Sequence, residues 1–504
     1  MDTFSSLADG FAIALTWQNL LLALLGCFLG TIMGALPGLG PSNGVAILIP
    51  LAFSLGLGPT ASMILLTSVY YGAMYGGRIS SILLNIPGDE PAMMTCLDGY
   101  PMAKKGLAGE ALSLSGVASF VGAFIATWGL ILLAPQLVRF ALLFGPAEYF
   151  ALFALAFATL GGVASTNQAK SAFAAMLGLG LSVIGVDTQT GVPRLTFGEV
   201  HLYDGIDFLV AIVGLFALSE VFIFLEHRHG AASADNAKIR IGRITPPVAM
   251  LKQTAPTMLR ASVVGFVAGV LPGAGASLGS FLSYAVEKKL VDRKGTFGTG
   301  DPRGVAAPEA GNNAAAGGAL VPMLTLGVPG SGTTAVLLAL LMTLNITPGP
   351  TLFTDRPEVV WGLIATLLIA NFVLLAMNVP MVKIFVRILM VPPAILLPGV
   401  TMISFVGIYS LSGSSFDLLL MILFGIMGWL FRKMDIPTVP IILGILLGGS
   451  MEDNLRRAMT LSGGDPLYLF SSPIAVVLWV MAILGFVAPI FLRRYLRKPP
   501  AVTD

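Results

Sequence analysis

The sequence predicts an all-α polytopic membrane protein with about twelve transmembrane helices in two homologous repeats that contain broken helices or re-entrant hairpins. Only 11% of the 504 residues are charged, whereas a soluble domain carries roughly 25%. Hydrophobic residues make up 56% of the chain, and its mean hydropathy is +0.88. So few charges cannot cover a globule with solvated side chains. This excludes a soluble enzyme, a secreted scaffold, a disordered protein and a nucleic-acid binder.

The membrane helices are predicted to be irregular. The chain has 59 glycines and 32 prolines, a combined share of roughly 18% against roughly 12% in average usage. In an apolar chain this excess favours broken, closely packed helices. The N-terminal segment carries Asp2 and Asp9 but no basic residue. We therefore expect the first apolar run to be a membrane helix rather than a secretory signal peptide.

The first half begins with a long tract without charge, from Gly10 to Gly77. Because one span needs about 20 residues, this tract is predicted to contain a first span at Leu20–Leu36 and a further helical segment from Val45. A polar, turn-rich segment is predicted from Arg78 to Glu110. The remaining apolar runs of this half are Ala111–Leu133, Phe140–Leu160, Ala172–Val186 and Phe208–Leu225.

The second half follows a hydrophilic stretch from Glu226 to Arg260 that is rich in lysine and arginine. A basic loop of this kind is predicted to be cytoplasmic, so the chain divides into repeat 1 (1–230), a basic linker (231–258) and repeat 2 (259–504). The apolar or charge-free runs of the second half are Ala261–Val286, Ala310–Thr354, Val359–Val382, Ile388–Phe416, Leu418–Phe431, Ile436–Met451 and Pro466–Leu492.

Two motifs occur once in each half. The pattern Gly-x3-Gly-x-Leu-Pro-Gly-x-Gly-x-Ser-x-Gly runs from Gly30 to Gly44 and returns 235 residues later, from Gly265 to Gly279. A second element, Asn85–Asp89, matches Gly327–Ser331 at an offset of 242 residues. Two elements in the same order indicate two homologous halves. Only the second copy is preceded by a basic loop, so the halves are predicted to cross the membrane in opposite directions, as in secondary transporters.

The repeated motifs predict a binding site for an anion. A helix broken at Pro-Gly exposes backbone groups that lipid cannot satisfy, so such breaks persist only inside protein or beside a watery cavity. A helix N-terminus offers free amides to carboxylate oxygens. We expect Ser42 or Asn43 and Ser277 to cap the helices after the first motif, and Asp89 and Ser331 or Thr333 those after the second. The candidate substrate-binding residues are Gly40, Ser42, Asn43, Gly44, Arg78, Gly88, Gly275, Ser277, Gly330, Ser331, Thr333 and Thr334.

A coupling cation is predicted at the carbonyl ends of the preceding half-helices. The candidate Na+ ligands are Pro37, Gly38, Pro272, Gly273, Asn312 and Asn313. Other interpretations stay open. The glycines at 26, 30 and 34 favour simple close packing, the two asparagines are equally suited to helix–helix hydrogen bonds, and Arg78 is equally suited to the membrane interface. Asp89 and Glu90 have no acidic counterparts in the second half.

These motifs resemble the large membrane subunit of tripartite tricarboxylate transporters. The resemblance rests on Ala35–Pro50, Tyr70–Gly106, Gly269–Ser280 and Pro308–Leu338, and it extends from about Leu20 to Leu492. It implies a permease in the bacterial inner membrane that imports citrate or another carboxylate, driven by a Na+ or H+ gradient. It also implies two partners, a small four-helix membrane subunit and a periplasmic substrate-binding protein. No other cofactor is implied.

Three alternatives remain at this stage. A stand-alone carboxylate transporter needs no partners, and a channel conducts without saturation. A membrane-embedded aspartyl protease needs two aspartates in facing spans. Its candidates here, Asp204 and Asp301, are predicted to lie in loops. We therefore expect a transporter rather than an enzyme.

Overall fold

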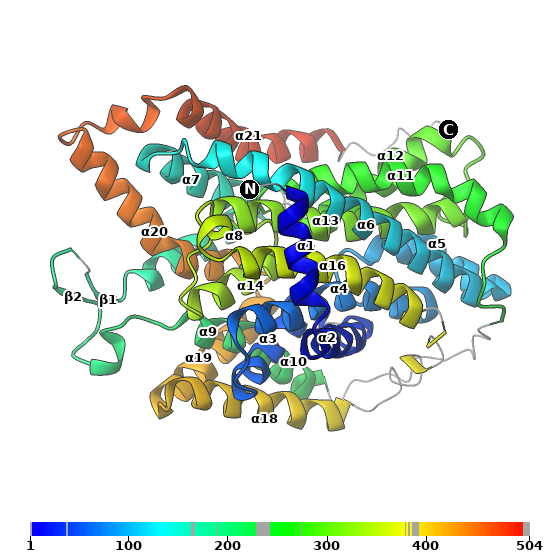
Figure 1. Ribbon diagram of the computed structural model, residues 1–504, viewed down its shortest axis with the longest axis horizontal. Helices are drawn as coiled ribbons and strands as arrows, with labels where there is room; N and C mark the ends of the chain where they lie inside the picture. The colour runs from blue at the N-terminus through cyan, green and yellow to red at the C-terminus, as the bar shows by residue number, and fades with distance from the viewer. Residues whose placement is uncertain are drawn as a thin grey trace.

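The computed structural model describes residues 3–36, 39–162, 167–187, 189–227, 242–273, 275–378, 380–381, 384–385 and 393–496. Over these residues the chain forms a bundle of helices, and its strands are the two-residue segments β1 (Gly185–Val186) and β2 (Pro193–Arg194), which pair antiparallel (Figure 1). The predicted all-α fold class is confirmed.

The first half contains α1 (Thr3–Ala14), α2 (Trp17–Ala35), α3 (Gly40–Ser54), α4 (Pro59–Leu84), α5 (Met93–Met102), η1 (Ala103–Leu107), α6 (Ala108–Ala141), α7 (Pro146–Gly162), α8 (Gln168–Ser182), η2 (Val200–Leu202), α9 (Phe208–Ile212), η3 (Val213–Leu218) and α10 (Ser219–His227). The second half contains α11 (Val248–Val270), α12 (Gly275–Val291), α13 (Pro302–Leu326), α14 (Gly332–Thr343), α15 (Leu352–Asp355), α16 (Pro357–Asn378), α18 (Pro393–Ser412), α19 (Ser415–Lys433), α20 (Val439–Leu461), η4 (Pro466–Phe470) and α21 (Pro473–Leu496).

Helices α4 and α13 are the core of the two halves. Every residue from Ser62 to Leu83 of α4 is buried, and so is every residue from Gly304 to Thr325 of α13. These stretches are separated by the 242 residues that also separate the second sequence motifs (304 − 62 = 242). A helix that is buried all round needs no polar face. For this reason neither helix shows an amphipathic pattern in the sequence.

The repeated glycines bring neighbouring helices into backbone contact. A Cβ added at Gly30 or Gly34 of α2 would overlap the carbonyl oxygen of Val69 or Ala73 in α4. The second copy repeats these contacts, because Gly265 and Gly269 of α11 lie against Gly311 and Ala315 of α13. The packing interpretation of these glycines is confirmed. The same glycines also fix where the breaks that follow them lie.

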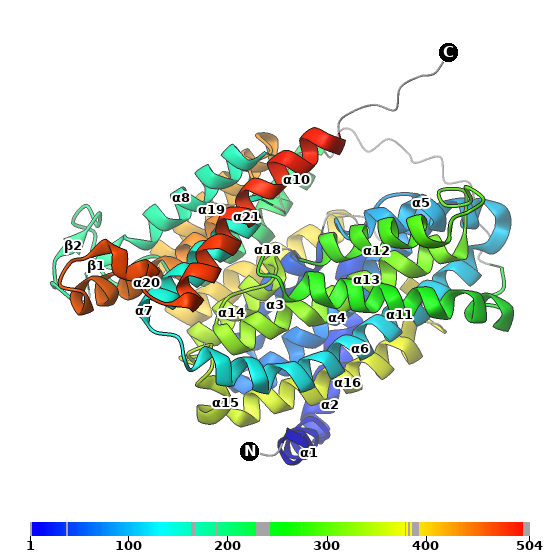
Figure 2. The same ribbon diagram turned by 90° about the horizontal axis from the view of Figure 1, so that it is seen from above.

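A second group of helices packs beside this core. Helix α8 packs against α20, α7 against α20 and α21, and α19 against η3 and α10. Figure 2 shows α7, α8, α19, α20 and α21 together on one side, with α4, α6, α11, α13 and α16 on the other. Helix α3 connects the two groups, because it packs against both α4 and η3.

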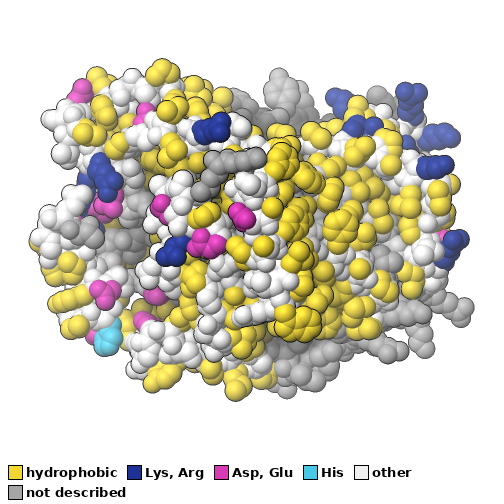
Figure 3. Space-filling model, viewed as in Figure 1, with side chains coloured by type: hydrophobic (Ala, Val, Ile, Leu, Met, Phe, Trp, Pro, Cys, Tyr) yellow, Lys and Arg dark blue, Asp and Glu magenta, His cyan; other side chains and the backbone are white. Residues whose placement is uncertain are grey.

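The two ends of the long axis differ in charge. The β1–β2 hairpin lies at one end, and the ends of α5, α11 and α12 lie toward the other (Figures 1 and 2). Most of the lysine and arginine side chains visible in Figure 3 gather at this second end, while hydrophobic side chains cover much of the surface between. An apolar surface beside a basic end is typical of a membrane protein whose basic side is cytoplasmic.

Five of the described helices are long and apolar enough to cross a membrane. They include α2, α16, α19 and the continuous helix Phe208–Glu226, and the fifth is a long helix over Met93–Ala141. Shorter apolar helices such as α3 and α14 accompany them. The predicted number of about twelve spans stays a prediction.

Several helices begin or end away from the predicted boundaries. Within the predicted turn-rich segment 78–110 only residues 85–92 are non-helical, and the rest forms the end of α4, α5, η1 and the start of α6. Buried partners for the polar side chains make the helices possible there. The run ending at Val186 stops being helical at Ser182, and α11 begins at Val248, inside the segment assigned to the linker.

Candidate functional site: four helix breaks

The first motif produces the same break in both halves. After α2 the chain turns extended at Leu36 (φ −77°, ψ 118°), and after α11 it does so at Leu271 (φ −71°, ψ 121°). The next helix begins at a glycine in the left-handed region, Gly40 (φ 56°) or Gly275 (φ 65°). A residue with a Cβ rarely adopts this conformation, so glycine is favoured at both positions. The candidates Pro37 and Gly38 lie outside the described residues, while Pro272 and Gly273 are buried.

The second motif also repeats its geometry. Helix α4 is followed by Asn85 (φ 56°), and α13 is followed by Gly327 (φ 69°), both in the left-handed conformation. The glycines three residues later pack against the adjacent helix. A Cβ at Gly88 would overlap backbone atoms of Gly34 and lie 2.6 Å from Cα of Gly77, and one at Gly330 would lie 2.7 Å from Cα of Ala319.

Helix capping differs between the breaks. Ser331 caps α14 with a capping box, in which its Oγ accepts from the Thr334 amide (3.2 Å) and Thr334 Oγ1 accepts from the Ser331 amide (2.8 Å). The cap predicted at Ser331 is confirmed. The caps predicted at Ser42, Asn43 and Ser277 are wrong, because α3 and α12 already begin at the preceding glycines.

The break before α5 differs from its counterpart before α14. Asp89 Oδ1 accepts from the Ala92 amide at 3.0 Å, so Asp89 closes a turn ahead of α5 instead of capping it. Ala92 itself is the N-cap residue of α5. The predicted Asp89 cap is therefore wrong as well.

Hydrogen bonds connect each half to the other at the breaks. The hydroxyl oxygens of Ser42 in α3 and Thr333 in α14 lie 2.9 Å apart. The first break of the second half meets the second break of the first half in the same way. There, Ser277 Oγ of α12 donates to Glu90 Oε2 (3.2 Å) and Ser280 Oγ donates to the Pro91 carbonyl (2.7 Å). The first break of each repeat thus meets the second break of the other.

Within each half the two breaks are also adjacent. The Gly275 amide donates to the Gly330 carbonyl at 3.1 Å. A Cβ at Gly275 would lie 3.7 Å from Cβ of Ser331, and one at Gly40 would lie 3.5 Å from Cβ of Asp89. The four breaks therefore form one contiguous region, in which Gly88 and Gly330 are buried while Glu90 and Leu271 are exposed.

Tyr70 of α4 contacts residues of both halves of the chain at the breaks. It is fully buried, and its hydroxyl donates to the carbonyl of Ala316 in α13 at 3.4 Å. It also interacts with the Ser331 side chain and lies near the Asp89 carboxyl group. The apolar run around Tyr70 gave no indication of this role.

Arg78 takes part in a buried polar network. Its Nη1 donates to Ser119 Oγ (3.2 Å), and this hydroxyl donates to Glu309 Oε2 (2.9 Å). Thr95 Oγ1 donates to Glu309 Oε1 at 2.5 Å, and the Arg78 guanidinium lies 4.9 Å from the Tyr75 ring centroid. The network joins α4, α5, α6 and α13. Arg78 is only 2% exposed, so the interfacial interpretation does not describe it.

The two asparagines of α13 are buried near the middle of the helix. Asn313 Nδ2 donates to the Glu309 carbonyl of its own helix at 3.1 Å. Asn312 Oδ1 has no hydrogen-bond partner among the described residues, and neither does Asp89 Oδ2, although both atoms are buried. Buried oxygens without a donor are suited to a cation or to an additional hydrogen-bond donor.

The remaining break residues are placed as follows. Gly44 lies in the buried part of α3 against Met33 of α2, and Thr334 completes the capping box. The structure thus gathers the serine, threonine and glycine candidates at the breaks, and it places Arg78, Asn312 and Asn313 on the two central helices. Glu220 of α10, which contacts Asn43, is not among the predicted site residues. A single acidic residue inside the apolar run Phe208–Leu225 was the available signal.

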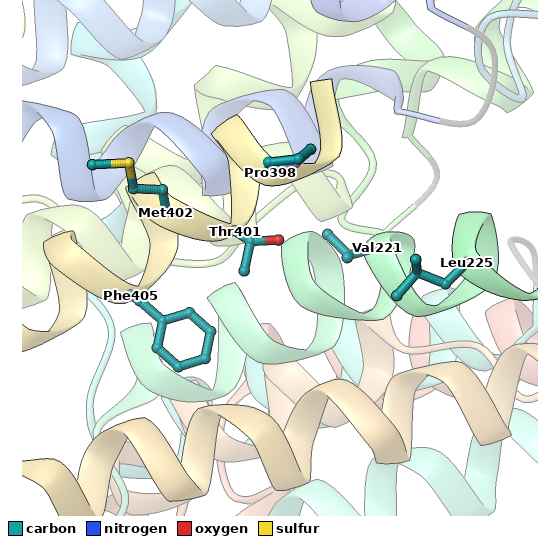
Figure 4. A pocket seen from close by; sticks show the side chains of 6 residues that line it. All are labelled: Val221, Leu225, Pro398, Thr401, Met402 and Phe405. Carbon is teal, nitrogen blue, oxygen red and sulfur yellow. The ribbon is translucent and has the colours of Figure 1, made fainter. Parts of the chain in front are cut away.

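A groove of about 410 Å³ lies elsewhere, between α10 and α18. Figure 4 shows Val221 and Leu225 on one side and Met402 and Phe405 on the other, with Pro398 and Thr401 completing it. Its lining is almost entirely apolar, so it lacks the donors that a carboxylate requires.

The helical bundle, its apolar surface and its apolar membrane-length helices define a multi-pass membrane protein. Residues 20–443 match the tripartite tricarboxylate transporter TctA family. Over 485 residues the chain is 38% identical to the "Uncharacterized 52.8 kDa protein in TAR-I ttuC' 3'region" of Agrobacterium vitis, covering 95% of this chain and 94% of that protein. A second Agrobacterium vitis protein, from the TAR-II ttuC' 3' region, is 39% identical over 214 residues, covering 42% of this chain and 88% of that protein. No solved structure matches.

The chain belongs to the tripartite tricarboxylate transporter TctA family. This is a family of transporters and not of enzymes. The two aspartates that a protease would need lie at a helix end and in a loop. Asp301 is the N-cap of α13 and pairs with Arg303 at 2.7 Å, and Asp204 lies exposed in the loop after η2.

Proposed function

We propose that this protein is the large permease subunit of a binding-protein-dependent secondary transporter. It imports citrate, another tricarboxylate or a related organic carboxylate across the bacterial inner membrane. Membership of a tripartite family supports partnership with a small membrane subunit and a periplasmic binding protein.

The observation that carries this proposal is the contact between Ser42 and Thr333, which joins a break of one repeat to a break of the other. A carboxylate at this junction would meet the amides of the first turns of α3 and α14 together with several hydroxyl groups. Backbone amides and helix dipoles attract an anion without a dedicated arginine at each oxygen.

The transport of an anion is coupled in this proposal to an inward flow of Na+ or H+. The unpartnered buried oxygens of Asp89 and Asn312 support a cation near the breaks, since oxygen atoms are the preferred ligands of such ions. Pro272 and Gly273 are buried just after the end of α11. The last carbonyl groups of that helix point toward the break and are further candidate ligands for the cation.

The two repeats are proposed to be inverted. The basic end of the molecule, with Lys288 and Lys289 at the end of α12, lies opposite the hairpin end in Figures 1 and 2. Labelling of single cysteines from either side of the membrane tests this arrangement. We expect the N-terminus outside and the 226–260 segment inside, and labelling of both from one side would contradict an inverted repeat.

Uptake of labelled citrate and succinate into cells that hold the permease and both partner subunits tests the function. Alanine at Ser42, Asn43, Ser277 or Thr333 should lower uptake severalfold at an unchanged amount of permease in the membrane. Matched controls are Ser262→Ala and Thr325→Ala, because each of these buried hydroxyls bonds only the backbone of its own helix. Full uptake by all four break variants would refute the assigned site. Uptake that rises without saturation would favour a channel.

A further inference from the structure

A buried acidic residue lies beside the first helix break, on a helix outside the repeated motifs. Glu220 is the second residue of α10 and is 4% exposed. It follows the π-helical segment η3 (Val213–Leu218). An extra residue in a helical turn rotates all that follows by about 100°. The π-helical segment therefore sets the direction in which Glu220 points.

Glu220 connects the break to the end of another helix. Its Oε2 accepts from Asn43 Nδ2 at 3.4 Å and also from Arg432 Nη1 near the end of α19. The Arg432 side chain is 33% exposed, while that of Glu220 is 5% exposed. A carboxylate can only accept hydrogen bonds when it is ionised, so it fixes the orientation of the Asn43 amide, whose NH2 group must face it.

The charge of Glu220 conflicts with an anion site unless it is compensated. Asn43 lies in the first turn of α3, beside Ser42, where the proposed function places the carboxylate. A buried negative charge this close would repel a second one, and the repulsion is strong where water is scarce. Arg432 supplies the compensating positive charge. A second ion pair, Glu226 with Lys433, joins the same two helices but is 40% and 45% exposed.

We propose that Glu220 and Arg432 act as a charge-neutral positioning pair for the carboxylate site. Glu220 holds the amide of Asn43 in the orientation that the site uses, and Arg432 cancels the charge that would otherwise repel the substrate. This proposal rests on the proposed function, and it adds residues outside the repeated motifs to the determinants of anion affinity.

Equilibrium binding of labelled citrate and succinate to the full chain in nanodiscs tests the pair. Arg432→Gln exposes the site to the uncompensated carboxylate and should raise the dissociation constant about tenfold or more. Glu220→Gln removes the negative charge while its amide oxygen can still accept from Asn43, so it should lower the dissociation constant. The double variant should return the constant to within about threefold of wild type. Lys433→Gln is the matched control, because it removes one positive charge from the same helix without touching a residue that contacts Asn43. Gel filtration establishes that each variant is folded.

The outcomes separate this proposal from the proposed function. A merely structural ion pair would reduce the amount of folded protein similarly in both single variants and leave the dissociation constant of the folded fraction unchanged. That result, or an equal effect of Lys433→Gln, overturns the positioning pair while carboxylate binding by the wild-type chain stands. If the wild-type chain binds neither carboxylate, the proposed function fails and the inference fails with it.

Discussion

Replacement of Gly34 by alanine tests how the helix breaks are held in place. Gly34 lies two residues before the break at Leu36, and a Cβ there would overlap the carbonyl oxygen of Ala73 in α4. Gly269 has the same relation to the break at Leu271 and to Ala315. A backbone carbonyl cannot rotate away as a side chain can. The added methyl group must therefore push α2 from α4, or α11 from α13.

The magnitude follows from two opposing contributions. Overpacking of a close-packed interior costs typically about 1–3 kcal/mol and occasionally more. Alanine is favoured over glycine in a helix interior by about 0.5–1 kcal/mol. Because the clash is with backbone, we expect the upper part of the overpacking range and a net destabilisation of about 1–2.5 kcal/mol for either variant.

Thermal unfolding of the purified protein in detergent measures the effect. Gly34→Ala and Gly269→Ala should both unfold at lower temperature than wild type, and both should lose carboxylate uptake because the break residues shift. Gly180→Ala in α8 is the matched control, since a Cβ there has no atom within 4 Å. It should unfold at the same or a higher temperature. Unchanged unfolding and uptake for Gly34→Ala would refute the argument that close packing positions the breaks.

Three further predictions concern polar contacts. Asp98 of α5 accepts from the amides of Gly300 and Asp301, each at 2.8 Å. Asp98→Asn removes the charge from these hydrogen bonds and should lower the unfolding temperature, equivalent to about 1.5–3 kcal/mol. Ser331→Ala removes the cap of α14 and should cost about 1 kcal/mol, whereas Ser331→Thr should retain most of it in the same thermal assay. Hydrogen bonds from Arg456 hold the pKa of Asp187 below its usual range. The contribution of the Asp187 carboxylate to stability is therefore present above the unfolded-state pKa of about 3.9 and is lost as pH falls through the lower folded value. At neutral pH, Asp187→Asn should make the β1–β2 hairpin more sensitive to proteolysis. In strong acid, wild type and variant should be cleaved at the same rate.

Much of this architecture was predictable because it depends on local backbone chemistry. The duplicated Pro-Gly motifs predicted duplicated breaks, and the structure gives both copies the same backbone turns at Leu36 and Leu271. The cap at Ser331 follows from a serine ahead of an apolar run. The caps at Ser42 and Ser277 were wrong because a glycine with positive φ allows each helix to begin earlier.

Contacts between distant parts of the chain were not predictable from spacing. Nothing in the sequence pairs Ser42 with Thr333 across 291 residues, or Glu220 with Arg432 across 212 residues. Arg78 was expected at the edge of a polar segment, yet its partners Ser119 and Glu309 allow it to be buried. Such partners come together only in the folded chain, because long segments of sequence separate them.

Protection of a cysteine at the breaks by substrate tests the central claim most directly. The two native cysteines, Cys27 and Cys96, are first replaced by alanine, and Ser277→Cys is then reacted with a maleimide in the presence or absence of citrate or succinate. The account predicts that a transported carboxylate slows labelling of this cysteine and leaves labelling of Ser471→Cys, at the exposed end of η4, unchanged. Equal labelling of Ser277→Cys with and without a carboxylate that the protein transports would contradict a substrate site at the four breaks.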